Sequence, residues 1–334
     1  MSTDEDDEDE LEIAVENYAV SGPKARRCVF LAMRYDAGAG YRPGDSETWI
    51  AGNDMTVDFE GSSMVMNGTA AWYTGIWATL EGSLFVTRHD GWIIRNRDIF
   101  QDVAFERWEN DELGTHTLTG VHGLDGDNVF VWGHDPTASD DTYPASDVFR
   151  WDGHGWNRTA GPGFQIVAMH GTAPDDLWVG GPGGAFARWD GKSWAREPSS
   201  HEAMINSIFV AAPGEVYATA TDGTVMERKG KKMVPIGVIP GADAPADVKC
   251  VAKWDGALWV GAGRLGVFRR VRRSADFECV KPNIDCVAMD AREELVACCR
   301  SMIAGTDNGR DWNGYGVDLI HDERAPYALL ENLG

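Results

Sequence analysis

The sequence that decides the fold is DLWVGGPGGAFARWDGKSW, at Asp176–Trp194. It begins with a short apolar run that has an aromatic residue near its middle, and a similar run returns about every 40 residues. Four successive copies start at intervals of 39, 42 and 37 residues. Self-similarity with this period is typical of one supersecondary unit repeated in an array. The clearest copies are VFVWG (Val129–Gly133), LWVGG (Leu177–Gly181), VYATA (Val216–Ala220), LWVGA (Leu258–Ala262) and LVACC (Leu295–Cys299).

Each repeat contains four strand signals separated by turns rich in Gly, Asp and Pro. In the copy at 164–198 the strands are Gln165–His170, Leu177–Gly181, Ala185–Trp189 and a fourth that begins at Trp194. Short β-rich runs with this punctuation predict antiparallel hairpins. The phrase WDGxxW recurs at Trp151–Trp156, Trp189–Trp194 and Trp254–Trp259, and we expect its tryptophans to pair across hairpins in a structural role.

Extending the register toward the N-terminus adds second strands at Val29–Ala32 and Ile76–Thr79, which makes seven repeats. One four-stranded sheet cannot cover both of its own faces, so neighbouring sheets must stack. The sequence therefore predicts an all-β, seven-bladed β-propeller with four-stranded antiparallel blades. Six blades remain the alternative if the first unit is an irregular extension. The blades are expected at about 28–61, 62–114, 115–160, 161–200, 201–240, 241–281 and 282–320.

The first unit has no evident innermost strand. Cys28–Met33 reads as a second strand, followed by Thr48–Gly52 and Met55–Phe59 as the third and fourth. The C-terminal run at 327–333 is a strand signal without a blade. We therefore expect this C-terminal strand to supply the missing inner strand and close the ring.

The chain of 334 residues is strongly acidic, with a net charge of -23 and 43% hydrophobic residues. Met1–Glu16 holds nine acids and no Lys or Arg, which predicts a disordered acidic tail at 1–20 before one propeller domain at 21–334. This tail is either a solubilising extension or a docking segment for a basic partner.

Composition also argues against several classes of function. A protein this acidic lacks the basic surface that nucleic acid requires. The sequence has no apolar run of 18 residues and no basic segment before a hydrophobic stretch, which predicts neither a membrane span nor a signal peptide. The six cysteines show no CxxC pair, so we expect reduced thiols in a cytoplasmic and monomeric protein.

Two segments carry a family resemblance. Asp176–Trp194 and DVFRWDGHGW (Asp147–Trp156) resemble the bacterial propeller proteins of the WD-like, YVTN and BNR (Asp-box) repeat group. GTDNGRDW (Gly305–Trp312) resembles an Asp box, with matches at Asp307, Gly309 and Trp312 and departures at Gly305 and Asp311. The resemblance implies the propeller fold. It implies no single activity, because the group includes sialidases, assembly factors and binding scaffolds.

Motifs for catalysis or cofactor binding are missing from the sequence. The eight histidines are scattered without an HxH or HExxH pair, and there is no Gly-x-Ser-x-Gly elbow or P-loop. We therefore predict no catalytic residues, no metal and no cofactor.

Long insertions between strands give the best indication of function. They occur at Tyr35–Glu47, Ile99–Gly114, His134–Ser146 and Gly237–Ala246, and the predicted register places all four on one face of the ring. The first three contain eleven acids against two arginines, together with several aromatic residues. Acids steer a basic partner, and aromatic residues anchor protein interfaces. The candidate partner-binding residues are Tyr41, Asp45, Trp108, Glu109, Asp111, Glu112, Asp135, Asp140, Asp141 and Tyr143.

The leading functional hypothesis is a propeller without catalytic activity that binds a basic protein through this acidic, aromatic face. One form of it is an immunity-like inhibitor of a toxin or effector. An assembly or chaperone-like scaffold is an alternative, and a glycoside hydrolase or lyase acting at the central funnel is another.

Overall fold

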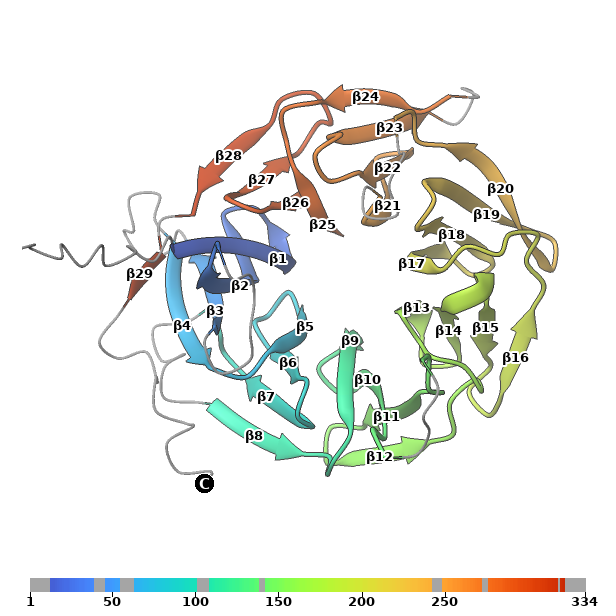
Figure 1. Ribbon diagram of the computed structural model, residues 1–334, viewed down its shortest axis with the longest axis horizontal. Helices are drawn as coiled ribbons and strands as arrows, with labels where there is room; N and C mark the ends of the chain where they lie inside the picture. The colour runs from blue at the N-terminus through green and yellow to red at the C-terminus, as the bar shows by residue number, and fades with distance from the viewer. Residues whose placement is uncertain are drawn as a thin grey trace, which may run out of the picture.

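The computed structural model describes residues 13–38, 46–54, 63–100, 108–137, 142–241, 248–271, 276–317 and 319–321. These residues form seven sheets arranged as blades around a central channel (Figure 1). Each blade has four consecutive antiparallel strands, and the first strand of each lies nearest the channel. This confirms the predicted seven-bladed propeller with four-stranded blades.

The strands follow the chain order from blade to blade. Blade one has β1 (Ile13–Lys24), β2 (Arg27–Asp36), β3 (Glu47–Asp54) and β4 (Ser63–Thr69), and blade two has β5 (Tyr73–Ala78), β6 (Leu84–Arg88), β7 (Trp92–Asn96) and β8 (Trp108–Glu112). Blade three has β9 (Thr117–Asp125), β10 (Asn128–His134), β11 (Asp147–Trp151) and β12 (Trp156–Thr159), and blade four has β13 (Ala168–Ala173), β14 (Asp176–Gly180), β15 (Phe186–Trp189) and β16 (Trp194–Glu197), with a 3₁₀ turn, η2 (Pro182–Gly184). Blade five has β17 (Ile205–Ala212), β18 (Glu215–Ala220), β19 (Thr224–Lys229) and β20 (Lys232–Val238). Blade six has β21 (Cys250–Trp254), β22 (Ala257–Gly261), β23 (Val267–Val271) and β24 (Glu278–Lys281), and blade seven has β25 (Cys286–Ala291), β26 (Leu295–Cys299), β27 (Met302–Thr306) and β28 (Asn313–Gly316).

The repeated apolar run forms the second strand of its blade. Every residue of β14, β22 and β26 is buried, because the adjacent blades cover both faces of the strand. In blade two the prediction was wrong by one strand: Ile76–Thr79 belongs largely to the inner strand β5, and the second strand is β6. The two strands differ in burial: every residue of β6 is buried, whereas β5 contains both buried and partly exposed residues.

Blade one corrects two predictions. Residues 13–20, expected in the acidic tail, form most of β1, which fills the inner position that the C-terminus was expected to fill. The acids of this segment suggested a tail, but its apolar residues pack in the core: Tyr18 and Ala19 lie against one core cluster, and Val20 belongs to another. Asn17 fastens β1 to blade seven, because its backbone N–H and side-chain Nδ2 donate to the carbonyls of Arg300 (2.8 Å) and Cys299 (3.0 Å). Residues 1–12 lie outside the described residues.

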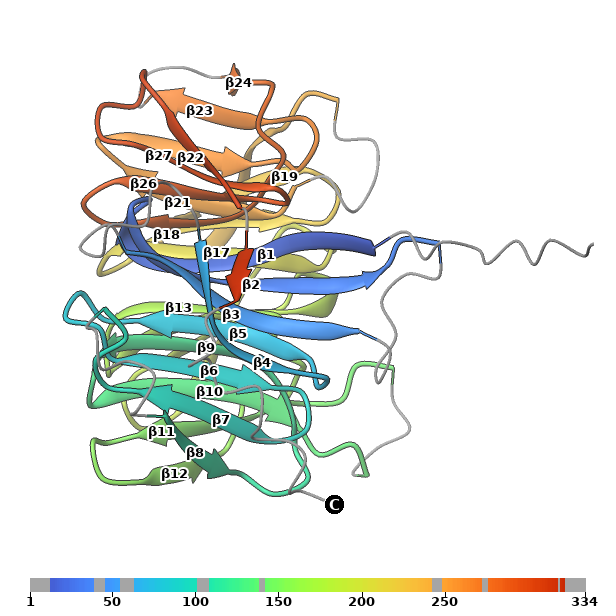
Figure 2. The same cartoon turned by 90° about the vertical axis from the view of Figure 1, so that its left-hand side faces the viewer.

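The C-terminal part of the chain lies at the opposite edge of blade one. The short strand β29 (Leu319–His321) pairs in parallel with the outermost strand β4 (Figures 1 and 2). The proposed closing strand at 327–333 and the proposed fourth strand at Met55–Phe59 both lie outside the described residues. The strand that pairs with β3 in the fourth position is β4.

The two faces of the ring carry different connections. One face, here called the turn face, carries the links between first and second strands and between third and fourth strands. The other, the long-connection face, carries the links between second and third strands and between successive blades. Figure 2 shows the ring from its side, with the two faces at the left and right. None of the described residues forms a helix with the length and apolarity to cross a membrane.

Two of the three WDG phrases behave as predicted. Trp151 and Trp156 are direct cross-strand partners with ring centroids 5.5 Å apart, and Trp189 and Trp194 match them at 5.3 Å. The third phrase differs, because Trp254 pairs with Ala257 across a two-residue turn in which Asp255 has a φ of 45°. Its tryptophan rings still approach to 6.2 Å.

Candidate functional site

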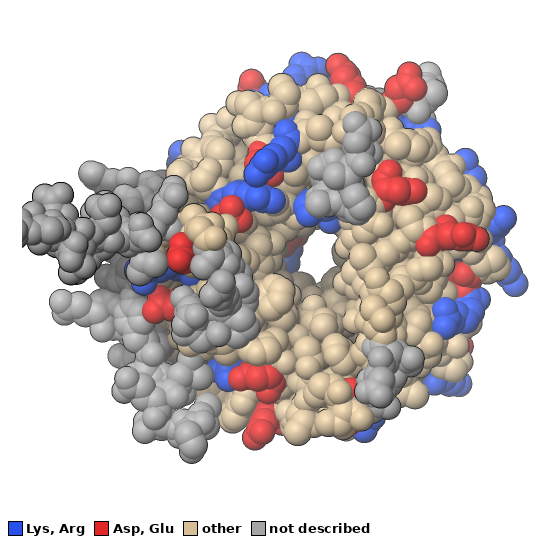
Figure 3. All heavy atoms as spheres, viewed as in Figure 1, with Lys and Arg blue, Asp and Glu red and all other residues tan. Residues whose placement is uncertain are grey.

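The central channel contains a cavity of about 820 Å³. The inner strands and several links of the turn face line it. In Figure 3, seen from the long-connection face, the ring is open at its centre. A cavity of this size lies within the range of ligand-binding sites.

A stack of three rings lines one side of the channel. His122 of blade three lies 4.6 Å from His170 of blade four, which lies 4.7 Å from Phe209 of blade five, measured between ring centroids. The backbone N–H of Gly171 donates to Nε2 of His122 at 3.0 Å, and that of Val210 donates to Nδ1 of His170 at 3.1 Å. Each histidine therefore joins its own blade to the next.

Both histidines are neutral at pH 7. Burial is the main reason that the pKa of His122 is lowered to about 4; the hydrogen bond with Gly171 acts in the opposite direction, and the positive charge of Arg292 acts in the same direction as burial. Burial also lowers the pKa of His170, with the charges of His122 and Arg292 acting in the same direction. Nδ1 of His170 accepts a backbone N–H and therefore carries no proton, which agrees with this direction.

Asp290 and Arg292 of blade seven link three blades on the other side of the channel. Their side chains form an ion pair at 3.0 Å. Asp290 accepts from the backbone N–H of Gly22 at 2.9 Å, while Arg292 donates to the Ala78 carbonyl of blade two at 2.7 Å. Arg292 also donates to Ser21, whose hydroxyl accepts from the backbone N–H of Ala78. These bonds occupy Asp290, the carboxylate deepest in the channel, in a structural role.

Three acids surround the channel where it meets the turn face. Glu81 and Glu293 belong to links between first and second strands, Asp125 is the last residue of β9, and all three are exposed. Lys24 pairs with Glu293 at 3.1 Å, and Leu80 adds an apolar side chain that is 46% exposed. We call Glu81, Asp125 and Glu293 the acidic rim. With Trp77 and the ring stack behind it, the acidic rim combines negative charge with aromatic faces, which suits a cationic side chain. The described residues contain no group of His, Cys, Asp and Glu arranged to hold a metal ion.

Four of the predicted partner-binding residues lie in β8 rather than in a loop. Asp111 accepts from Nε and Nη2 of Arg95 at 2.5 and 3.2 Å and from the Trp156 indole N–H at 2.9 Å. Glu109 pairs with Arg95 at 2.9 Å and with Arg97 at 3.2 Å. Trp108 is half-buried and Glu112 is exposed. Asp111 and Glu109 therefore stabilise the contact between blades two and three.

The link before β8 corrects the predicted placement of the insertions. It joins the third and fourth strands of blade two and therefore belongs to the turn face, not to the face of the other three insertions. The backbone N–H of Ile99 donates to the carbonyl of Gly82, which lies in a first-to-second link on that face. The sequence WENDE of β8 escaped recognition because an outermost strand needs little apolar surface.

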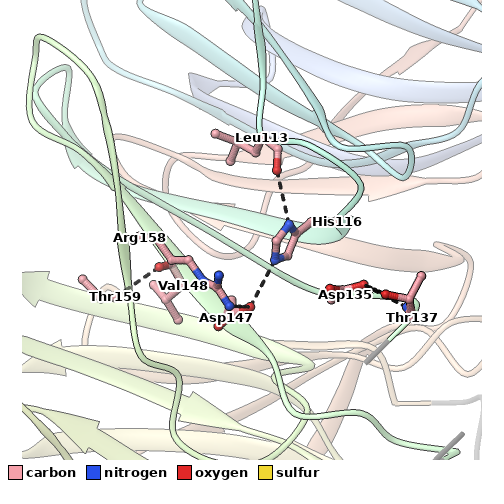
Figure 4. Close-up of polar contacts among 8 residues, drawn as sticks. All are labelled: Leu113, His116, Asp135, Thr137, Asp147, Val148, Arg158 and Thr159. Carbon is pink, nitrogen blue, oxygen red and sulfur yellow. Dashed lines mark hydrogen bonds and ion pairs between the residues drawn. The ribbon is translucent and has the colours of Figure 1, made fainter. Parts of the chain in front are cut away.

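The remaining predicted residues that the structure describes lie on the long-connection face. Asp135 accepts from the backbone N–H and hydroxyl of Thr137 at 2.8 and 2.7 Å, and these bonds lower the pKa of its carboxyl (Figure 4). In the same figure Asp147 accepts from Arg158 at 2.7 Å and contacts Nε2 of His116 at 3.1 Å. Tyr143 is 55% exposed. Tyr41, Asp45, Asp140 and Asp141 lie outside the described residues.

The described members of the predicted site thus do not form one patch: some stabilise a blade contact and others lie on a separate face. Sequence reasoning missed the channel histidines. The sequence contains one signal that could have indicated them, a His-Gly dipeptide at the same position of two successive first strands, His122–Gly123 and His170–Gly171.

Comparisons with known proteins agree with the fold. No protein-family model matches the chain, and no curated protein matches its sequence. Similar solved structures include the WD40 propeller domain of Doa1, with a TM-score of 0.60 and 10% identity over 88% of this chain and 90% of that one. The propeller domain of Cps50 (Swd1) from Myceliophteria thermophila has a TM-score of 0.57 and 10% identity over 90% and 97% of the two chains. YCF48 bound to a D1 peptide has a TM-score of 0.54 and 11% identity over 73% and 80%. At these identities the likeness concerns the fold alone.

Proposed function

We propose that the protein is a scaffold without catalytic activity that binds a basic protein partner at the acidic rim of its channel. The observation that carries the proposal is that the exposed carboxylates of the acidic rim line the same cavity as the aromatic rings of Trp77 and Phe209. Carboxylates accelerate the arrival of a basic segment, and aromatic faces favour lysine or arginine side chains. YCF48, a propeller of similar fold, has been solved with a D1 peptide bound, which supports peptide binding in this proposal.

The acidic rim is a different surface from the one that the sequence suggested, which stays a prediction. Two acids of that surface, Glu109 and Asp111, are neutralised by arginines of their own blade. The proposal includes two kinds of partner, a toxin-like effector and a client in assembly. It also includes a cytoplasmic location and a monomeric state. The relation of Gly305–Trp312 to Asp-box repeats also stays a prediction.

Charge reversal tests the proposal once a partner has been captured from the native host and identified by mass spectrometry. We expect the pair Glu81→Lys and Glu293→Lys to slow association at least tenfold at low salt and to reduce its salt dependence. Asp125 is left unchanged because it accepts bonds from Asn128 within its own turn. Surface plasmon resonance at several salt concentrations measures both effects.

The matched control carries the same change of charge on the long-connection face, with Glu112→Lys and Glu202→Lys. It should alter the association rate less than twofold. A control that slows binding more than the rim variant would place the partner on the long-connection face, and two variants with unchanged kinetics would contradict an electrostatic interface altogether.

A further inference from the structure

A groove of about 350 Å³ opens between blades three and four, away from the channel. Blade four contributes the paired indoles of Trp189 and Trp194, and Trp194 donates its indole N–H to the carbonyl of Ala160 at 2.9 Å. Blade three contributes a wall of polar side chains, and Phe130, Val148 and Leu177 complete the lining. The polar wall consists of Arg150, Asp152, Asn157 and Thr159.

The neighbouring contact between blades two and three shows what fills such a groove. There the guanidinium of Arg95 lies 4.3 Å from the ring centroid of Trp151 and covers it. Asp111 and Glu109 bind Arg95 in that position, at 2.5 and 2.9 Å. The space that remains is only about 170 Å³.

Strand register identifies the counterparts of these residues in blade three. Phe85 pairs with Arg95 and Phe130 with Arg150, so Arg150 corresponds to Arg95. By the same register Asn157 corresponds to Glu109 and Thr159 to Asp111. Both carboxylates that draw the arginine across the groove are therefore replaced by neutral side chains. In blade two, Arg95 pairs with Glu109 and Ile93 pairs with Asp111. In blade three, Arg150 pairs with Asn157 and Val148 pairs with Thr159.

Arg150 consequently stays on its own blade. Its guanidinium lies 5.8 Å from the ring centroid of Phe130, and Nη2 donates to Oδ1 of Asn128 at 2.6 Å. Its buried Nε has no hydrogen-bond partner among the described residues. The groove is thus left open beside the indole pair of blade four.

The chemistry of the groove selects a neutral ring with several hydroxyl groups. Asp152 is already oriented, since it accepts from the N–H groups of His154 and Gly155, both at 3.0 Å, and from Asn157 at 2.9 Å. One arginine, one carboxylate, one amide and one hydroxyl offer donors and acceptors in balance, so neither a cation nor an anion is favoured. Apolar and aromatic walls with a few placed polar groups are typical of small-molecule sites.

We propose that this groove binds a pyranose ring, with the apolar face of the sugar on Trp189 and Trp194 and its hydroxyls on Arg150, Asp152 and Asn157. The site goes beyond the proposed function and is separate from the acidic rim. The same sugar could arrive as a free oligosaccharide or as a glycan on a protein.

Titration with the methyl pyranosides of glucose, galactose, mannose and N-acetylglucosamine tests the site in the full chain. We expect saturable binding of at least one glycoside, with a Kd on the order of 1 mM, seen by tryptophan fluorescence and by saturation-transfer NMR. Trp189→Ala should weaken this binding at least tenfold. A glycoprotein that carries the same terminal sugar, before and after enzymatic removal of its glycan, distinguishes the two sources.

A second variant fills the groove without removing a core residue. Asn157→Glu with Thr159→Asp restores the two missing carboxylates, so Arg150 should cross over and cover Trp189. This variant should remain folded by circular dichroism and lose sugar binding at least tenfold, whereas Glu112→Gln should bind as the parent chain does. Absence of saturable binding by all four glycosides, binding unchanged in both groove variants, or preferential binding of arginine amide or benzoate would each overturn the proposal.

Discussion

The fold lowers the pKa of the two channel histidines, His122 and His170. Both are neutral in the folded chain, and the unfolded chain takes up a proton at each histidine near pH 6.5. Their contribution to the free energy of unfolding is therefore complete above pH 6.5 and is lost as the pH falls toward 4.

For His122, whose pKa falls to about 4, this loss amounts to about 3 kcal/mol between pH 6.5 and pH 4. We expect His122→Gln, whose amide oxygen can still accept from Gly171, to show a shallower decline over this range. Urea unfolding at pH 7.0, 5.5 and 4.5 measures it, with the exposed His154→Gln as the control. Equal slopes for the parent chain and His122→Gln would contradict the assignment.

Gly123 is required by the close approach of a neighbouring blade. A Cβ at this position would lie 2.4 Å from ring atoms of Trp77 in blade two. We expect Gly123→Ala to displace Trp77 and to lower the free energy of unfolding by about 1–3 kcal/mol. Chemical denaturation measures the loss, and Gly155→Ala, which meets no atom within 4 Å, should change stability by less than about 0.5 kcal/mol. Equal effects of the two substitutions would show that Trp77 does not restrict this position.

At the scale of elements, β8 connects blades through charged side chains. Removal of the Asp111 carboxylate would leave Arg95, whose side chain is 11% exposed, and the Trp156 indole N–H without this acceptor. We expect Asp111→Ala to lower the free energy of unfolding by about 2–4 kcal/mol. The exposed neighbour Glu112→Ala should change it by less than about 0.5 kcal/mol. Weaker partner binding by Asp111→Ala at unchanged stability would instead support the role that the sequence suggested.

How much of the fold could be predicted from the sequence also depends on the type of strand. Second strands such as β14 could be predicted because burial on both faces demands a continuous apolar run. Inner and outermost strands lie partly open to the channel or to solvent, so β1 and β8 carry acids that resemble those of loops. The candidate site was also not predicted, because it lies on inner strands that are partly open to the channel. The channel becomes a site only when single residues of different repeats, such as His122 and His170, are brought together.

At the scale of the whole molecule, closure of the ring depends on Asp290 and Arg292. Each is mostly buried and has partners on more than one blade. We expect Asp290→Ala and Arg292→Ala each to lower the free energy of unfolding by about 2–4 kcal/mol, because each leaves a charged partner unpaired. The double variant should cost at least 1 kcal/mol less than the sum of the two. A double-mutant cycle by chemical denaturation measures this coupling, and additive losses would show that the pair does not act as one unit.

The order of the strands in blade one has a further consequence for protein engineering. Blade one takes its four main strands, β1 to β4, from consecutive residues, and the far end of the described chain adds only the short outer strand β29. The blades are therefore interchangeable as starting points, and a circularly permuted gene opened between β12 and β13 should encode the same ring. Such a permutant, with its natural ends joined by a linker, would have its new ends between blades three and four, where a reporter could be fused.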